Sequence, residues 1–414
     1  MNRPDVERIK DVLQQSAVTS STAQRQDAGA SWLFVRYLNR AAQMAETGYA
    51  TSSDIDNAMR GACRLIKGPC ELADAIGGQN VRQRSHALNA SLVPAQREPT
   101  AGNTATTETR DTTSKRLCAV GIVGSGTMAT GVAETFARAG VTVRLSARGS
   151  DSADRASSTL ARSIGKARLA VDERAQLMNL LHVEVGLGHL QDCGLIIECS
   201  SEDLETKSAL FAQLDKACGP HAVLASTTSS LRISTLAAQT TRPNRVVGMH
   251  FFNPAPVMPM VEVVTTRITE PKVVAFVRAA AEALGKETVL CGDRPGFIVN
   301  RLVIPYVNDA LRVVSQGLAP DRLDATMREI FGFPMGPIDL LELIGLDIAL
   351  AIQTTLHEAF PQDDLVPNPY MTALVRAGYL GRKTGDSIRP HLASPPALAG
   401  ATPEQRSNLS ILGR

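Results

Sequence analysis

The chain has 414 residues, of which 44% are hydrophobic and 20% are charged, and its formal net charge is +2. This composition is typical of a globular protein with two or three domains, and it excludes a disordered or fibrous chain. The near-neutral charge gives no electrostatic basis for binding nucleic acid or an anionic membrane. No apolar run approaches the roughly 20 residues that span a bilayer. The start lacks the apolar core of a signal peptide, and the seven cysteines are scattered without a C-x-x-C pair. We therefore expect reduced thiols, a cytoplasmic location and no metal site.

Residues 1–78 are predicted to form an α-helical module that repeats a segment near the C-terminus in degenerate form. The runs 36–41 and 67–72 resemble 305–310 and 335–340. The offset is 269 residues for the first pair and 268 for the second, so a single inserted residue accounts for the drift. Apolar residues at spacings of three and four, with a Gly-Pro loop in each copy, indicate that both copies are helical.

Residues 79–116 differ in composition from the segments on either side. Threonine, charged residues and small residues dominate, and no apolar period is sustained. Such a segment cannot bury enough surface to offset the entropy lost on ordering. We predict a flexible linker between the helical module and the main body of the chain.

A short apolar run at 118–123 leads into a glycine-rich turn and then a helical pattern. Gly124, Gly126 and Ala129 form the pattern G-x-G-x-x-A in the strand–turn–helix context of a dinucleotide site. The first glycine permits the tight turn, the second lets the backbone approach the pyrophosphate, and the alanine allows close packing of the helix. The helix N-terminus supplies free N–H groups for the phosphates. The turn therefore predicts a bound nicotinamide dinucleotide.

The end of the next predicted strand, at 141–145, bears on the choice of dinucleotide. An NAD site usually has Asp or Glu here to bind the ribose hydroxyls, whereas this chain has Ala147 followed by Arg148. A carboxylate repels a 2′-phosphate, and a guanidinium with nearby hydroxyls binds one. The sequence thus predicts NAD or NADP, with NADP slightly favoured. Arg148 pointing to solvent or stacking on the adenine is an equally open alternative.

Three polar side chains, Glu202, Ser229 and His250, each follow a short apolar strand pattern. Ligands of doubly wound sheets bind at the C-terminal ends of the strands, so these side chains are expected to converge. A histidine held by a carboxylate such as Glu262, beside a dinucleotide site, suits hydride transfer to or from an alcohol. The residues therefore predict an alcohol/ketone oxidoreductase.

From about residue 117 to 385 the chain resembles the L-3-hydroxyacyl-CoA dehydrogenases of the 3-hydroxybutyryl-CoA dehydrogenase type. The matching motifs are Gly124-x-Gly126-x-Met128, Thr228-Ser229-Ser230-Leu231, His250-Phe251-Phe252-Asn253-Pro254, Pro295-Gly296-Phe297-Ile298-Val299-Asn300-Arg301, Met335-Gly336-Pro337 and Gly381-Arg382-Lys383-Thr384-Gly385. The resemblance implies an α/β Rossmann-like, doubly wound NAD(P)-binding domain at 117–294. It implies an all-α domain at 295–385, which commonly mediates dimerisation in this family. The implied reaction interconverts (3S)-3-hydroxyacyl-CoA and 3-oxoacyl-CoA in fatty acid metabolism.

The resemblance also implies roles for individual residues around the reacting atoms. His250 corresponds to the general acid/base, and Glu262 corresponds to the carboxylate that orients it. Ser229 and Asn300 correspond to residues that hydrogen-bond the substrate oxygen and hold the nicotinamide, while Asn253 is a weaker candidate for substrate contact.

Further residues are implied in binding the cofactor and CoA. Met128 belongs to the glycine-rich turn, and Glu202 and Lys207 match contacts to the nicotinamide ribose. Arg162 and Lys166 lie on a basic helical stretch that either meets the CoA phosphates or forms a solvated face.

The chain departs from the family pattern in several places. Ala147 replaces the ribose-binding acid, and Ser31 stands where the second helical copy has Asn300. The first copy is therefore predicted to be a packing module rather than an active one. The segment 386–414 lacks the aromatic ending of the family and is predicted to be a disordered tail.

The expected partner is an acyl-CoA substrate, and two assemblies fit the repeat. One is a homodimer through the C-terminal domain, and the other is a monomer in which residues 1–78 take the place of a second subunit. Two alternatives to the implied activity remain open. One is the same chemistry on an acyl-carrier-protein thioester or a small hydroxy acid, and the other is an inactive dinucleotide-binding scaffold.

Overall fold

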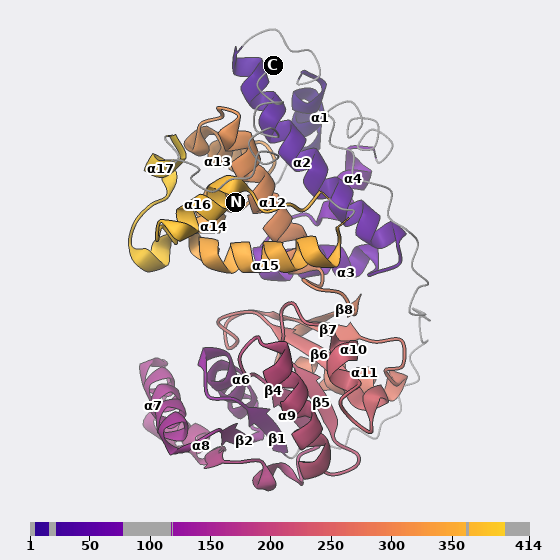
Figure 1. The fold of residues 1–414 in the computed structure, drawn as a ribbon, viewed down its shortest axis with the longest axis vertical. Coiled ribbons are helices and arrows are strands. Elements are labelled where there is room, and N and C mark those ends of the chain that lie inside the picture. Colours follow the sequence, from indigo (N-terminus) through magenta and orange to yellow (C-terminus); the bar gives the residue numbers. More distant parts are fainter. Residues whose placement is uncertain (1–4, 16–21, 78–116, 118, 362–363, 394–414) are drawn as a thin grey trace. The chain divides into compact units, whose positions relative to one another are not determined.

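The computed structural model describes residues 5–15, 22–77, 117, 119–361 and 364–393. The chain divides into two units, one drawn from Thr100–Phe297 and one that combines Met1–Pro99 with Ile298–Arg414 (Figure 1). The whole predicted linker, residues 79–116, and residues 394–414 of the predicted tail lie outside the described residues. None of the helices in the described ranges is both long and apolar enough to cross a membrane.

The unit Thr100–Phe297 is built on a sheet that has eight strands within the described residues, in the order β3-β2-β1-β4-β5-β6-β7-β8. Neighbouring strands run parallel, except that β6 and β7 are antiparallel. The central strands β1, β4 and β5 are mostly apolar and almost entirely buried, as is usual for a parallel sheet that is covered on both faces. The strands are β1 (Ala119–Val123), β2 (Thr142–Ala147), β3 (Leu181–Val185), β4 (Leu195–Glu198), β5 (Val223–Ser226), β6 (Val246–Phe251), β7 (Met260–Thr265) and β8 (Glu287–Gly292).

Helices connect the strands of this unit and pack on the sheet. Helices α6 and α7 contact β2 and β3, and α11 contacts β7 and β8 (Figure 1). The chain passes from β1 outward to β3 and then returns to β4 on the other side of β1, which places the topological switch point between β1 and β4. The predicted Rossmann-like class is confirmed. The helices are α6 (Thr127–Arg138), α7 (Ser150–Lys166), α8 (Val171–Asn179), α9 (Leu204–Ala217), α10 (Ile233–Ala237) and α11 (Pro271–Ala283), with 3-10 turns at η1 (Gly188–Leu190) and η2 (Pro243–Arg245).

The second unit is helical and joins the two ends of the chain. Its elements are α1 (Val6–Gln15), α2 (Thr22–Glu46), α3 (Ser52–Cys63), α4 (Pro69–Ala75), α12 (Val299–Ser315), α13 (Pro320–Glu329), α14 (Pro337–Ile344), α15 (Leu346–Ala359), α16 (Pro369–Arg376), η3 (Arg382–Thr384) and α17 (Arg389–Ala393). Helix α2 packs along α12, where the rings of Tyr37 and Tyr306 lie 5.6 Å apart. Phe34 of α2 stacks on Phe331 at 4.2 Å. The predicted helical domains are therefore present and share a core.

The same loop contact occurs in both helical copies. Asp56 accepts hydrogen bonds from the backbone N–H groups of Cys70 and Glu71, at 2.7 and 3.0 Å. Asp324, 268 residues later, accepts the equivalent pair from residues 338 and 339, at 2.9 and 3.1 Å. A Cβ atom on either Gly68 or Gly336 would lie 2.2 Å from Cγ of that aspartate, so the Gly-Pro loops require glycine. These contacts agree with the repeat predicted from the sequence.

The prediction of disorder is wrong for residues 386–393. Ile388 is fully buried, and its N–H donates to the carboxylate of Glu342. Arg389 forms ion pairs with Asp324 and Asp339 at the start of helix α17. The composition of the segment suggested a tail, but one apolar and one basic side chain are enough to attach it to the helical unit.

Candidate active site

The glycine-rich turn between β1 and α6 has the geometry of a phosphate-binding loop. Gly124 has a φ of +134°, and a Cβ there would lie 2.6 Å from the carbonyl oxygen of Cys199. A Cβ on Gly126, the N-cap of α6, would meet no atom within 4 Å, so its open side is available to a ligand. Ala129 is fully buried, which lets α6 pack close to the sheet. The turn therefore fits a dinucleotide pyrophosphate at the N-terminus of α6.

The turn opens on a cavity of about 800 Å³. Gly124, Gly126 and Met128 line one part of it, and Ala147 and Arg148 line another. The strands that carry these segments are neighbours, with Val123 beside Ser146 in the parallel register. The cavity thus brings together the predicted pyrophosphate and ribose positions, in agreement with a nicotinamide dinucleotide that lies across the ends of β1 and β2.

His250 and Glu262 form a direct cross-strand pair. The antiparallel register of β6 and β7 sets the two residues opposite each other, and Nδ1 of His250 lies 2.6 Å from Oε2 of Glu262. The side chain of Glu262 is fully buried, and the side chain of His250 is 9% exposed. With Nδ1–H donating to Glu262, Nε2 carries the lone pair, and no described residue forms a hydrogen bond to it. This is the arrangement that a general acid/base requires.

Two aromatic rings fix the plane of the imidazole. Phe252 makes an edge contact at 4.7 Å between ring centroids, and Phe297 lies at 5.5 Å. Phe297 is fully buried and has a φ of +46°, a backbone conformation that is uncommon for a residue other than glycine. Such a conformation persists only where the surrounding packing enforces it, so we infer that packing holds Phe297 in place beside the imidazole.

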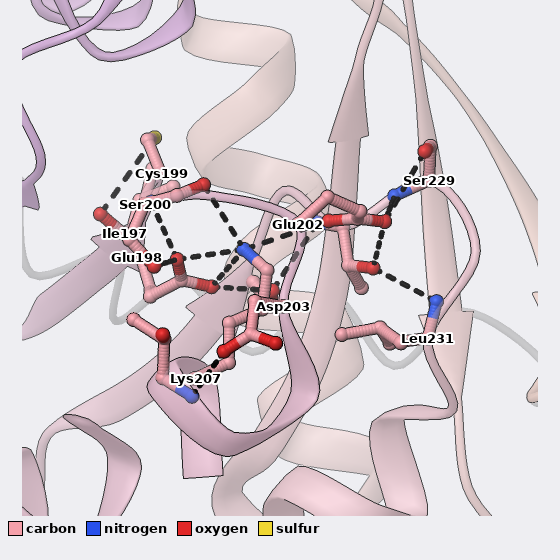
Figure 2. A network of polar contacts seen from close by, with 12 residues as sticks. Ile197, Glu198, Cys199, Ser200, Glu202, Asp203, Lys207, Ser229 and Leu231 are labelled. Carbon is pink, nitrogen blue, oxygen red and sulfur yellow. Dashed lines mark hydrogen bonds and ion pairs between the residues drawn. The ribbon is translucent and has the colours of Figure 1, made fainter. Parts of the chain in front are cut away.

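Glu202 holds the loop that carries Ser229 (Figure 2). One of its oxygens accepts hydrogen bonds from the backbone N–H groups of Ser229 and Ser230, at 2.8 and 3.0 Å. The same oxygen accepts the hydroxyl of Thr228 at 2.6 Å. Burial alone would raise the pKa of this carboxyl, but the hydrogen bonds and the charge of Lys207 lower the pKa below its usual value. The structure thus joins Glu202 to Ser229, two of the predicted site residues.

Glu198 is a residue of this region that the sequence analysis missed. It is fully buried at the end of β4, and both of its carboxylate oxygens accept from Nζ of Lys207, at 2.8 and 2.9 Å (Figure 2). Ser226 donates a further hydrogen bond to it at 2.7 Å. The available signal was a charged residue ending an otherwise apolar strand, since such a charge needs a partner when buried. Lys207 was predicted to contact the nicotinamide ribose; its amine is 1% exposed and engaged by Glu198, and the ribose contact stays a prediction.

The other predicted site residues lie outside these clusters. Asn253 is exposed just after β6, and Arg162 and Lys166 are exposed on α7. Asn300 lies in the first turn of α12, which belongs to the helical unit. The roles implied for these four residues stay predictions.

Two family models match the chain. The model of the 3-hydroxyacyl-CoA dehydrogenase NAD binding domain matches residues 119–294, which include the glycine-rich turn and the His250–Glu262 pair. The model of the 3-hydroxyacyl-CoA dehydrogenase C-terminal domain matches twice, at residues 30–110 and 296–389. The second model therefore recognises both helical copies.

Individual relatives agree with the family models. A 3-hydroxybutyryl-CoA dehydrogenase of Mycobacterium tuberculosis is 40% identical over 273 residues, which cover 64% of this chain and 96% of the relative. A mitochondrial hydroxyacyl-coenzyme A dehydrogenase of Sus scrofa is 37% identical over 281 residues, which cover 65% of this chain and 90% of the relative. The crystal structure of (S)-3-hydroxybutyryl-CoA dehydrogenase from Ralstonia eutropha superimposes with a TM-score of 0.62 at 35% identity, covering 66% of this chain and 98% of that one. The chain belongs to the 3-hydroxyacyl-CoA dehydrogenase family and is an oxidoreductase of that family.

Proposed function

We propose that the chain oxidises (3S)-3-hydroxyacyl-CoA to 3-oxoacyl-CoA, and catalyses the reverse reduction, with His250 as the acid/base. The observation that carries the proposal is the 2.6 Å contact between His250 Nδ1 and buried Glu262. A bound nicotinamide dinucleotide supplies the hydride acceptor. In oxidation, the C3 hydroxyl loses its proton to Nε2 of His250. The hydrogen on C3 leaves as a hydride, with the electron pair of the C3–H bond. In reduction, the same nitrogen returns the proton to the ketone oxygen.

The surrounding residues have supporting roles in this proposal. Glu262 keeps the proton on Nδ1 and stabilises the imidazolium that forms when Nε2 is protonated. Ser229 and Asn300 orient the substrate oxygen and the nicotinamide. Glu202 positions Ser229 through the hydrogen bonds to residues 229 and 230, and buried Glu198 fixes Lys207 behind it. The names of the matched relatives support a four-carbon 3-hydroxyacyl group as the first substrate to test.

The test is an absorbance assay at the nicotinamide band with acetoacetyl-CoA and reduced cofactor. We expect His250→Gln to lower kcat by about 10²- to 10⁴-fold, the usual contribution of a general acid/base, while cofactor binding is retained. His221→Gln is the matched control, because His221 is exposed in the same unit. Equal activity in the two variants would contradict the proposed role. If no acyl-CoA is turned over although the cofactor still binds, the result would favour a carrier-protein thioester, a small hydroxy acid or the inactive scaffold.

The arrangement of the helical unit supports a monomer in which the N-terminal copy replaces a second subunit. Tyr37 contacts Tyr306 and Arg40 contacts Asp309, and both pairs join residues that occupy equivalent positions 269 apart. Contacts between equivalent residues mark an approximate twofold axis, as in an isologous dimer. If a second C-terminal copy occupied the position of α2, Asp309 would face its own counterpart in a buried site. Arg40 instead provides the opposite charge, at 2.6 Å.

Light scattering coupled to size-exclusion chromatography tests this assembly on the intact chain. We expect the mass of one chain, 44.1 kDa. A dimer would contradict the proposal if cross-links between the chains mapped to α2 and α12. The deletion of residues 1–115 should expose the covered face of α12 and give a dimer or an aggregate.

We also place the protein in the cytoplasm. Six cysteines of the described chain are free, at positions 63, 70, 193, 199, 218 and 291. Free thiols are usual in reducing compartments, where disulfides do not persist. Cell fractionation with an antibody to the chain tests the location, and recovery in an extracellular fraction would contradict it.

A further inference from the structure

The adenosine end of the cofactor cavity carries positive charge and no carboxylate. Arg148, directly after β2, and Arg155, in the second turn of α7, both line it. Both side chains are exposed, and neither forms a hydrogen bond or ion pair with any residue that the structure describes. No Asp or Glu is among the lining residues. Two free guanidinium groups at one end of a ligand cavity indicate an anionic ligand group there.

The position of these arginines can be related to the parts of a dinucleotide. The pyrophosphate belongs at the N-terminus of α6, and the adenosine ribose at the end of the neighbouring strand β2. Ala147, which stands in place of the ribose-binding acid, is 2% exposed and leaves its methyl group at the cavity wall. A ribose bound there finds no carboxylate to accept hydrogen bonds from its hydroxyls and no negative charge to repel a phosphate.

The remaining polar groups at this end are consistent with an anion site. Helix α7 begins at Ser150, and its N-cap residue Gly149 is open, since a Cβ there would meet no atom within 4 Å. The hydroxyl of Ser152 also lines the cavity but is occupied by the cap, where it contacts the N–H and carbonyl of Gly149. Asp151 in the first turn is outside the cavity lining. The two arginines are therefore the groups that determine the charge of the subsite.

We propose that Arg148 and Arg155 form a subsite for the 2′-phosphate of NADP(H), so that the chain binds NADP(H) more tightly than NAD(H). The inference rests on the proposed function, because it concerns an added phosphate on the same cofactor. The family model and the fold account for the parts that the two dinucleotides share. The guanidinium groups account for the part that differs, since each can donate paired hydrogen bonds to phosphate oxygens.

Binding is measured by fluorescence titration of the intact chain with NADPH and with NADH, and by calorimetry with 2′,5′-ADP and 5′-AMP. We expect NADPH to bind at least about tenfold tighter than NADH, because one charge-assisted hydrogen bond contributes about that factor. Arg148→Ala and Arg155→Ala should each lower the NADPH/NADH affinity ratio severalfold, and the double variant should lower it further. Arg267→Ala is the matched control, at an exposed position of the same unit outside the cavity lining.

The outcomes separate the inference from the proposed function. Equal or tighter binding of NADH overturns the inference and leaves the dehydrogenase proposal standing. The same holds if the arginine variants weaken both dinucleotides equally, because the groups then do not read the 2′-phosphate. If neither dinucleotide binds, the proposed function itself fails.

Discussion

The N-terminal and C-terminal helical copies use the same loop to begin equivalent helices, but they differ at one polar position of the long helix of each copy. Asp56 and Asp324 make the same two hydrogen bonds to the backbone beyond a Gly-Pro step. The C-terminal copy has Asn300 in the first turn of α12, whereas the N-terminal copy has the fully buried Ser31. The fold therefore requires the loop in each copy, while an amide at the position of Asn300 is not required for packing.

A second difference concerns charge at the contact between the copies. Arg40 and Asp309 occupy equivalent positions, and they carry opposite charges that meet across the contact. Arg36 adds a second ion pair to Asp309 at 2.9 Å. Burial by itself would raise the pKa of Asp309, but the charges of Arg40 and Arg36 lower it. At this contact, each copy therefore matches the charge of the other copy, and it would not match the charge of a second copy of itself.

The largest effect is expected from breaking this charge pair. Arg40→Met leaves the fully buried Asp309 with one fewer cation, and it should lower the free energy of unfolding by about 3–5 kcal/mol. Urea denaturation of the intact chain measures the change. Arg60→Met is the matched control, because Arg60 belongs to a surface ion pair with Glu71 and should cost less than about 1 kcal/mol. Similar losses in both variants would show that the pair does not hold the copies together.

A loss of activity with no loss of folding is expected at the polar position that distinguishes the copies. Asn300→Ala removes an amide proposed to orient the substrate, and kcat should fall by about 10²- to 10³-fold, as for other groups that stabilise the reacting oxygen. Ser31→Ala changes the equivalent residue of the N-terminal copy and should leave kcat within about twofold. Steady-state assays beside thermal unfolding curves make the comparison. Equal losses of kcat would mean that both positions act through folding.

Much of this design could be predicted from the sequence, because the relevant signals are local. The turn at Gly124 and Gly126 has a fixed spacing, and the repeat keeps a nearly constant offset over both of its matches. His250 and Glu262 were predicted as a pair, and the antiparallel register of β6 and β7 explains their contact. Each of these predictions depended on residues close in sequence or on a motif with a known context.

Contacts that depend on the folded arrangement could not be predicted in the same way. Glu198 at the end of β4 and Lys207 in the first turn of α9 are nine residues apart, and their contact depends on the path of the chain between the strand and the helix. The ordered segment around Ile388 was missed because its buried position depends on Glu342, which is distant in sequence. Arg155 was missed because a sequence does not show which residues of α7 line the same cavity as Arg148.

A smaller effect concerns pH, through a carboxylate shared by both copies. Asp364 contacts Arg36 of α2 at 3.2 Å and Arg312 of α12 at 2.7 Å. Burial alone would raise its pKa, but these cations lower the pKa to about 2. The unfolded pKa of Asp is about 3.9, so the stabilisation is complete above that pH and is lost as the pH falls toward 2. The stability difference between the wild-type chain and Asp364→Asn should therefore shrink between about pH 4 and pH 2 in urea titrations. A difference that stays constant through this range would contradict the role of Asp364.

The smallest effect is expected at a bend that the two copies build from different residues. Arg64, after α3, has a φ of +55°, and Gly332, 268 residues later, has a φ of +74°. A side chain in this left-handed region costs about 1–2 kcal/mol, so Gly332→Ala should destabilise the chain by about 1 kcal/mol. Arg64→Gly removes the same strain but adds freedom to the unfolded chain, so it should stabilise by no more than about 0.5 kcal/mol. Opposite signs in matched urea denaturations would show that the N-terminal copy tolerates strain at a bend where the C-terminal copy has none. Destabilisation by Arg64→Gly would instead mean that the exposed arginine stabilises the fold by more than its backbone strain costs.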